Sequence, residues 1–303
     1  TPQHNPLPLP YALPFSRLAW LTNNQAQAAE AERAVSTGRR IDQPSDDPAA
    51  ASQILRHQGR LRRIEQYDRN NASARLWING ADGALQEAAT GLGRAKALAV
   101  QAGNDTLGTV ENAALAADIR AISEELRTIA NAKVQGRPIF AGTADGSEAY
   151  DLSGTYIGDT DAVVMTIDTD ETVIVGIPGP EVFGASNPAD PFTGSAFEAL
   201  NALADAVELG DNAAVRQGIE AVDLTTSRVG SAQGRIGAIS KQLDAAEFRH
   251  GGEKLSVETD VSKIRDTDIA EAIIRMRSTE ASYQATLSAT ARGLSTSLLD
   301  FLR

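Results

Sequence analysis

The sequence predicts a mainly α-helical, elongated protein with one small β-rich insertion. Apolar residues recur at alternating steps of three and four over long stretches, the pattern of helices that pack along a continuous seam. Hydrophobic residues make up 42% of the 303 residues but aromatic residues only 5%, so small aliphatic side chains must fill these seams. Between residues 139 and 194 the rhythm changes to short β-branched runs, which favour strands.

The first fifteen residues are expected to form an extended arm. They contain Pro2, Pro6, Pro8, Pro10 and Pro14, and repeated proline is incompatible with a helix interior. A helix becomes plausible from about Ser16. It would follow a short three-and-four rhythm of Leu18, Leu21, Gln25 and Ala28.

A long helix is predicted to begin at Pro48. Asp47 is a favourable N-cap, and proline suits the first helical position. The inward positions then alternate regularly at Ile64, Tyr67, Asn71, Ala74, Ile78, Ala81, Leu85, Ala88, Leu92, Ala95, Ala99 and Ala102. At 1.5 Å per residue this stretch is about 58 Å long, which predicts an elongated rod.

Two further helical stretches are expected to pack against this rod. A turn at residues 103–105 precedes a helix with an apolar face formed by Leu115, Ile119, Ile122, Leu126 and Ile129. A longer helix from about Asp211 to Glu247 carries a seam of Val215, Ile219, Val222, Thr226, Val229, Gln233, Ile236 and Leu243. The helices before and after the insertion must therefore pair across it.

The last helix is predicted to begin near two aspartates. Asp266 and Asp268 are candidate caps, and Glu271 follows Asp268 at the spacing of a capping box. The candidate helix-pairing and assembly residues of this helix are Ile269, Ile273, Met276, Tyr283, Leu287, Leu294, Leu298 and Phe301.

The insertion reads as a hairpin in an acidic setting. The β-branched runs 163–167 and 172–175 flank an acidic turn, and Tyr156 with Ile157 suggests one more strand. No Lys or Arg occurs between Arg137 and Arg216. A negatively charged, solvent-facing insertion is therefore expected.

Composition argues against several classes of function. The net charge of -12 disfavours nucleic acid and anionic membranes as partners. No run approaches the roughly 18 apolar residues of a membrane helix, and the basic-then-apolar order of a secretory signal is missing, so neither membrane insertion nor a cleaved signal peptide is expected. With no cysteine and with His4, His57 and His250 far apart, we expect no metal, cofactor or catalytic site.

Motifs at both ends of the chain resemble those of the bacterial flagellin family. STGRRI from Ser36 and PSDDPAA from Pro44 resemble the family's N-terminal signature, and IRDTDIAE from Ile264 and SLLDFL from Ser297 resemble its terminal helix. Within the family, GRPIFAGT from Gly136 and the insertion look more like hook–filament junction proteins than filament subunits. The signature residues are Ser36, Gly38, Ile41, Ser45, Asp46, Asp47, Pro48, Asp266 and Asp268.

The resemblance implies a flagellin-like helical bundle or coiled coil in which the N- and C-terminal helices pair. It assigns residues 16–43 with 262–303 to a terminal core domain, 44–138 with 195–261 to a rod, and 139–194 to the acidic insertion. It also implies an extracellular flagellar subunit at the hook–filament junction, exported without a cleaved signal peptide. The implied partners are a ring of identical copies, a proximal hook-associated protein, distal flagellin and an export chaperone.

Three other functions are weighed against the junction subunit. A filament flagellin would share the same motifs and polymerise indefinitely. A monomeric coiled-coil adaptor would be stable without assembly. An enzyme would need a pair of carboxylates at a fixed separation in the acidic insertion, and nothing in the sequence fixes such a pair.

Overall fold

The computed structural model describes residues 12–103, 108–144, 146 and 148–301, with side chains of the two terminal helices described from residue 19 and up to residue 292. The chain forms two compact units. Two long helices, at residues 48–102 and 212–265, contribute to both units. The terminal unit comprises residues 1–62 with 253–303, and the central unit comprises residues 63–252.

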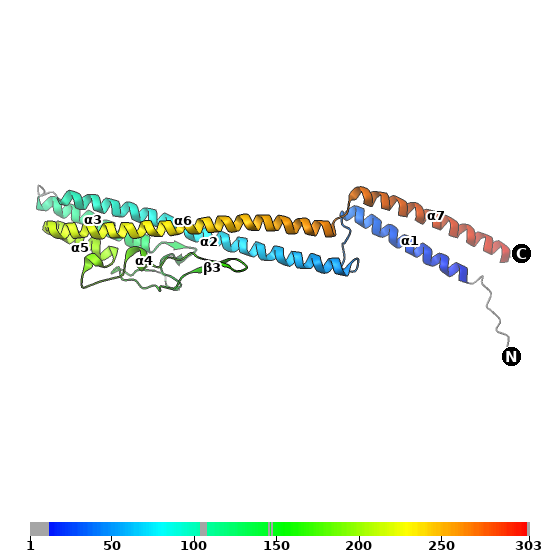
Figure 1. The fold of residues 1–303 in the computed structure, drawn as a ribbon, viewed down its shortest axis with the longest axis horizontal. Coiled ribbons are helices and arrows are strands. Elements are labelled where there is room, and N and C mark those ends of the chain that lie inside the picture. The colour runs from blue at the N-terminus through cyan, green and yellow to red at the C-terminus, as the bar shows by residue number, and fades with distance from the viewer. Residues whose placement is uncertain (1–11, 104–107, 145, 147, 302–303) are drawn as a thin grey trace, which may run out of the picture. The chain divides into compact units, whose positions relative to one another are not determined.

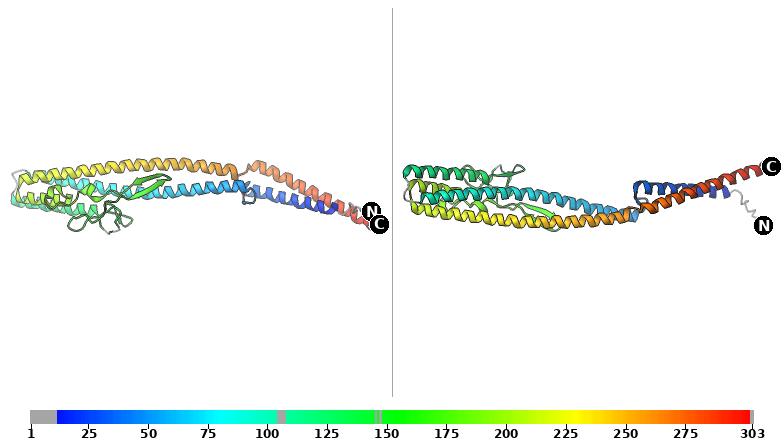
Figure 2. Two further views of the ribbon diagram at one scale, coloured as in Figure 1. Left: turned by 60° about the horizontal axis from the view of Figure 1, so that its bottom comes forward. Right: turned by 90° about the horizontal axis from the view of Figure 1, so that it is seen from above.

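The central unit is built on two antiparallel helices, α2 (Pro48–Ala102) and α6 (Asn212–Arg265). Within this unit they run side by side in Figures 1 and 2. Asn71 Nδ2 donates to the carbonyl of Leu243 at 3.0 Å, and Lys96 pairs with Asp223 at 2.5 Å, which fixes their register. The predicted α2 seam is buried from Ile64 to Ala102 except for the half-buried Tyr67.

The α6 seam follows the prediction with one correction. Val215, Val222 and Leu243 are at most 2% exposed, whereas Thr226 is exposed. Thr225 is buried instead, and its hydroxyl donates to the carbonyl of Ala221 at 3.1 Å. A threonine can occupy a buried helical position when its hydroxyl bonds to the preceding turn.

Two shorter helices complete the central bundle. The apolar face of α3 (Thr109–Ala130) is buried as predicted, while the turn predicted at 103–105 falls mostly outside the described residues. The sequence reasoning did not separate α5 (Ala196–Leu209), which packs against α3. Its signal was a capping box, in which Ser195 and Glu198 bond to each other's backbone N–H groups.

The insertion contains a small antiparallel hairpin and a short helix, and a second small hairpin lies just before it at residues 133–138. β1 (Lys133–Val134) and β2 (Arg137–Pro138) enclose a tight turn with positive φ at Gln135 and Gly136. β3 (Val164–Asp168) and β4 (Glu171–Ile174) form the predicted hairpin, and α4 (Gly179–Phe183) and the 3₁₀ turn η2 (Pro191–Thr193) follow it. The prediction of a further strand at Tyr156 and Ile157 is wrong, because Tyr156 makes only an isolated bridge with Tyr150.

Aromatic side chains join the insertion to the helices. Phe140 meets Phe183 edge-on at 5.3 Å between ring centroids, and Tyr150 meets Phe197 of α5 at 4.9 Å. Burial raises the pKa of the Tyr150 hydroxyl far above its usual range. The insertion therefore shares one hydrophobic core with the rod helices of the central unit.

The terminal unit pairs α1 (Ala12–Thr37) with α7 (Ile269–Phe301). Residues 1–11 of the predicted arm lie outside the described residues, but the helix starts at Ala12 and not near Ser16. Pro14 lies in the first turn, where a missing N–H breaks no helical hydrogen bond. Among the described residues, no helix is long and apolar enough to cross a membrane.

Candidate assembly surface

The terminal unit is organised around a short antiparallel contact between two chain segments. One is residues 38–41, which follow α1, and the other is residues 265–267, at the end of α6. Gly38 ends α1 in the left-handed conformation, with φ of 67°, which glycine adopts without strain. Its carbonyl accepts a hydrogen bond from the Thr267 N–H at 3.0 Å, and Arg40 N–H donates to the Arg265 carbonyl at 2.7 Å. The segment that leads into α2 and the segment that leaves α6 are thus joined by backbone hydrogen bonds.

Two neighbouring aspartates shape the loop between α1 and α2. Asp46 Oδ2 accepts the N–H groups of Gln43 at 2.8 Å and Asp42 at 3.0 Å. These backbone hydrogen bonds lower the pKa of Asp46, since they favour its ionised form. Asp47 Oδ1 accepts from Ala50 N–H at 2.9 Å, so it caps α2 as predicted.

A small apolar cluster holds the loop against the long helices. Ile41 is 6% exposed and packs with Ala50, Ile54 and Val261. Burial of Ile41 removes its side chain from water and contributes roughly 1.5 to 3 kcal/mol. The loop conformation therefore depends on a few contacts.

The two aspartates before α7 have different roles. Asp268 Oδ1 accepts from the N–H groups of Ala270 at 2.8 Å and Glu271 at 3.3 Å, so Asp268 is the cap. The prediction that Asp266 might also cap is wrong. Its carboxylate instead lies 2.7 Å from Arg265 Nε, and this bond lowers the pKa of Asp266.

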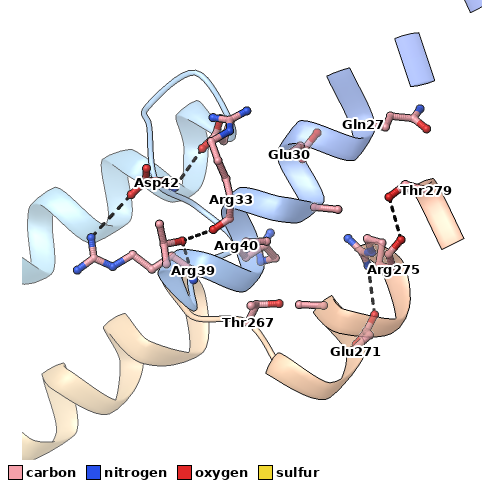
Figure 3. Close-up of a pocket in the computed structure, with 15 residues that line it drawn as sticks. Gln27, Glu30, Arg33, Arg39, Arg40, Asp42, Thr267, Glu271, Arg275 and Thr279 are labelled. Carbon is pink, nitrogen blue, oxygen red and sulfur yellow. Dashed lines mark hydrogen bonds and ion pairs between the residues drawn. The ribbon is translucent and has the colours of Figure 1, made fainter. Parts of the chain in front are cut away.

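A groove of about 340 Å³ lies where α1, the 38–47 loop and α7 meet (Figure 3). Four arginines line it, but so do four carboxylates, which gives the lining no net charge. The arginines are Arg33, Arg39, Arg40 and Arg275, and the carboxylates are Glu30, Asp42, Asp46 and Glu271. The groove consequently offers no preference for an anion.

The contact between α1 and α7 is a narrow seam of small and polar side chains. Ala31 and Ala272 are buried, at 4% and 5% exposure. Asn24 Nδ2 donates to Thr286 Oγ1 at 2.7 Å across the seam. The seam continues with partly buried side chains at Leu21, Ala28, Val35, Met276, Thr279, Tyr283 and Thr290.

Large apolar side chains flank this seam in contact with solvent. Trp20 is 67% exposed on α1, and Ile269, Ile274 and Leu287 are 54%, 69% and 48% exposed on α7. Ile269 and Leu287 lie five helical turns apart on one face, about 60° around the helix from Ala272. Between them on this face, Met276 belongs to the seam and Glu280 is exposed, so Ile269 and Leu287 are two separate apolar positions at the edge of the seam. A pair of helices buries one seam only, and these two edge positions are left in contact with solvent.

Two sequence models of one protein family match this chain. A sequence model of the bacterial flagellin N-terminal helical region matches residues 13–145, and a model of the bacterial flagellin C-terminal helical region matches residues 218–302. The chain belongs to the bacterial flagellin family. The two matches contain both helices of the terminal pair and most of the central rod.

Proteins similar to this chain include both flagellar hook-associated proteins and flagellins. Flagellar hook-associated protein 3 of Salmonella typhimurium is 27% identical over 88% of this chain and 92% of its own length. A flagellin of Bacillus subtilis is 27% identical over 82% of this chain and 83% of its own length. A solved structure of flagellar hook-associated protein 3 from Legionella pneumophila has 17% identity and a TM-score of 0.61, covering 70% of this chain and 98% of that one, which shows a common fold.

The predicted signature residues lie at the antiparallel contact of the terminal unit and in the loop that follows it. Gly38, Ile41, Asp46, Asp47 and the first helical residue Pro48 build the loop described above. Ser36 Oγ donates to the Arg33 carbonyl at 3.0 Å near the end of α1, and Ser45 lies exposed in the turn. Together these residues shape the loop between α1 and α2.

The predicted α7 residues separate into three groups. Ile273, Met276 and Tyr283 are partly buried, as expected for helix pairing. Ile269 and Leu287 are more exposed, at 54% and 48%. The side chains of Leu294, Leu298 and Phe301 lie outside the described residues.

Sequence reasoning missed the polar members of the seam. It placed Gln25 on the α1 face, whereas Gln25 is exposed and Asn24 makes the contact with Thr286. Thr279, Thr286 and Thr290 fall at steps of seven and four, a signal that was available but that a search for large apolar residues passes over.

Proposed function

We propose that this chain is a structural subunit of the bacterial flagellum that forms the junction between hook and filament. The observation that carries the proposal is the terminal pair, which leaves Trp20, Ile269 and Leu287 uncovered beside a completed seam. Covering half of a large aliphatic side chain contributes about 1 kcal/mol. Neighbouring subunits would supply that cover, so the terminal helices become fully packed only in the assembly.

The similarity to hook-associated protein 3 supports a place at the hook end of the filament. Identical copies form a ring in which each subunit covers the exposed Ile269 and Leu287 of the next, and the ring contacts a proximal hook-associated protein and distal flagellin. An export chaperone binds the terminal helices beforehand. The subunit leaves the cell through the flagellar export apparatus without cleavage of a signal peptide, and it carries out no catalysis.

The assembly role is tested by placing a charge at the exposed Leu287 of α7. Leu287→Glu places a carboxylate at the edge of the seam, and Ser278→Glu places the same group on the opposite face of the helix, because nine residues correspond to half a turn beyond two full turns. We expect both variants to keep the helix content of the parent chain. Only Ser278→Glu should restore filament attachment and motility to a strain lacking the gene.

Normal filament attachment by Leu287→Glu would refute the assembly role of this face.

A second test removes the whole last helix. A chain lacking residues 268–303 should not assemble, although the central unit stays folded. Retention of the central unit is checked by its circular dichroism and unfolding temperature, which separates lost assembly from lost folding.

Filament flagellin is the second candidate, supported by the similarity to the Bacillus subtilis protein. Gene deletion distinguishes the two. A junction subunit leaves hooks without filaments and releases flagellin into the medium, because export continues while the filament has no attachment site. Normal filaments in the deletion strain would exclude the junction role. Absence of flagellin from both cells and medium would favour the filament subunit.

A coiled-coil adaptor is separated by its behaviour in solution. It would remain monomeric and stable at high concentration, and Leu287→Glu would change nothing. A junction subunit should associate through the terminal unit in a concentration-dependent way, and that association should be lost in Leu287→Glu. Analytical ultracentrifugation of the parent chain and both glutamate variants makes this comparison.

A further inference from the structure

The central unit contains a buried histidine between two aspartates. His250 of α6 is 1% exposed, and its ring packs against Tyr67 of α2 with 6.0 Å between ring centroids. One side of the imidazole faces Asp68 of α2, and the other faces Asp168 at the end of β3. A buried polar ring normally has a partner for each nitrogen.

The contacts of the two ring nitrogens define the neutral tautomer. Nδ1 lies 2.7 Å from Asp68 Oδ1, and because a carboxylate only accepts, Nδ1 carries the proton. Nε2 then has a lone pair. It makes no hydrogen bond within the described residues and lies 3.9 Å from Asp168 Oδ2. Two acceptors therefore face each other where a proton would join them.

We propose that His250 is a proton-operated clasp that fastens the β3–β4 hairpin to α2 and α6. Protonation at Nε2 adds a second N–H directed at Asp168, and the two groups form a charged hydrogen bond as their separation closes from 3.9 Å to about 2.8 Å. The imidazolium then lies between two carboxylates, which compensate its burial. Deprotonation breaks the link to the hairpin but keeps the bond to Asp68.

Other charged groups near the clasp provide the background attachment. Arg249 of α6 lies 3.7 Å from Asp168 and forms an ion pair with Glu171 of β4. On the α2 side, Arg75 pairs with Asp244 and Glu247 of α6 at 2.8 and 3.0 Å. Arginine stays charged throughout the range in which histidine titrates. The Arg249 pairs hold the hairpin, and the Arg75 pairs hold α2 to α6, at every such pH, while His250 adds the part of the hairpin attachment that varies.

The position of Asp168 gives the clasp mechanical effect. The hairpin buries Ile167 and Val173 at 0% and 3% exposure, while Val164 and Ile174 on its outer face are 52% and 48% exposed. Asn70 Nδ2 donates to the Thr166 carbonyl at 2.8 Å. Asp168 borders the turn at the tip, so its bond to His250 restrains the end of the hairpin that would open first.

The clasp is tested with the full chain by a double-mutant cycle at two pH values. The parent, His250→Gln, Asp168→Asn and the double variant are compared at about pH 8 and about pH 5.5, which bracket histidine titration. Protection of the β3–β4 backbone amides against hydrogen exchange reports local opening. Asp168→Asn should reduce this protection about tenfold more at the lower pH in the parent, as expected for a charged hydrogen bond.

In the His250→Gln background the effect of Asp168→Asn should be equal at both pH values, because only the Arg249 contact is then lost. Asp170→Asn is the matched control, since it removes the same charge two residues away. An equal effect of Asp168→Asn at both pH values in the parent, or a pH dependence that persists in His250→Gln, would overturn the proposal.

A second measurement uses only the parent chain, so it does not depend on the folding of any variant. The parent chain has three histidines, so imidazole resonances can be followed individually by nuclear magnetic resonance. The amide shifts of β3 and β4 should change with the same midpoint as the His250 ring. Hairpin shifts that do not follow the ring would rule out the clasp. None of these results depends on the junction role.

Discussion

Asp46 shows how one side chain can fix the conformation of a loop. Its carboxylate accepts two backbone N–H groups of residues just before it, within the turn that leads from α1 to α2. The sequence predicted the cap at Asp47 because capping follows from position beside a helix. The bonds of Asp46 could not be predicted, since they depend on how the loop folds back through Ile41.

These bonds predict an acid-sensitive loop. Backbone N–H donors lower the pKa of Asp46 in the folded chain below its ordinary value of about 3.9. The stabilisation is therefore complete above that value and is lost as pH falls through the lower, folded-state pKa. In a nuclear magnetic resonance titration, the amide resonances of Asp42 and Gln43 should shift together with the Asp46 carboxyl.

Asp46→Asn is the control for this titration, because it preserves shape and removes the ionisable group. The shared acid-range transition of the Asp42 and Gln43 amides should disappear in this variant. A transition of the same size in Asp46→Asn would assign it to another carboxylate.

Helical seams were predictable wherever large or regularly spaced apolar residues mark them. The alternation from Ile64 to Ala102 identified the buried face of α2, including Asn71, because the rod requires one continuous stripe. On α7 the same approach selected Ile269 and Leu287, because a search for apolar positions picks large side chains whether or not they are buried. The structure buries Ala272 instead, because close approach of α1 selects small side chains.

The helix α5 and the shape of the insertion show a different limit. The β-branched runs identified β3 and β4 because their signal is local. The isolated contact of Tyr156 with Tyr150, and the packing of Phe197 on the insertion, arise from segments far apart in the chain. No periodicity within either segment encodes such contacts.

A matched pair of leucines on α6 tests the assignment of its buried face. Leu243 is fully buried and Leu255 is 66% exposed. Leu243→Ala should lower the free energy of unfolding by about 2 to 5 kcal/mol, because it removes buried methyl groups and leaves a cavity. Leu255→Ala should change it by at most about 0.5 kcal/mol. Urea unfolding followed by circular dichroism provides both values.

A loss of less than about 1 kcal/mol in Leu243→Ala would show that α2 and α6 are not packed there as described. An equal loss in both variants would point to a change in helix propensity, since alanine replaces leucine in the same helix in each case.

At the scale of the whole chain, apolar burial is distributed unevenly between the two units. The large core lies entirely within the central unit and joins the rod helices to the insertion. The terminal unit has the small cluster around Ile41 and the partly polar seam between α1 and α7. Stability should therefore reside in the central unit.

A chain restricted to residues 63–252 should consequently fold without the terminal helices. We expect it to retain a cooperative thermal transition with a midpoint within about 5 °C of the main transition of the full chain. The full chain should show, in addition, loss of helix at lower temperature from α1 and α7. Calorimetry and circular dichroism of the two chains measure this, and a fragment without a cooperative transition would contradict it.

The amide of Asn71 has a consequence for the register of α2 against α6. A seam rich in alanine is smooth, and two such helices can slide by one heptad while still presenting small apolar groups to each other. Sliding would move Asn71 away from the Leu243 carbonyl and leave a buried polar group unbonded, at a cost of about 1 to 3 kcal/mol. Asn71 thus holds the two helices at one fixed register along the rod.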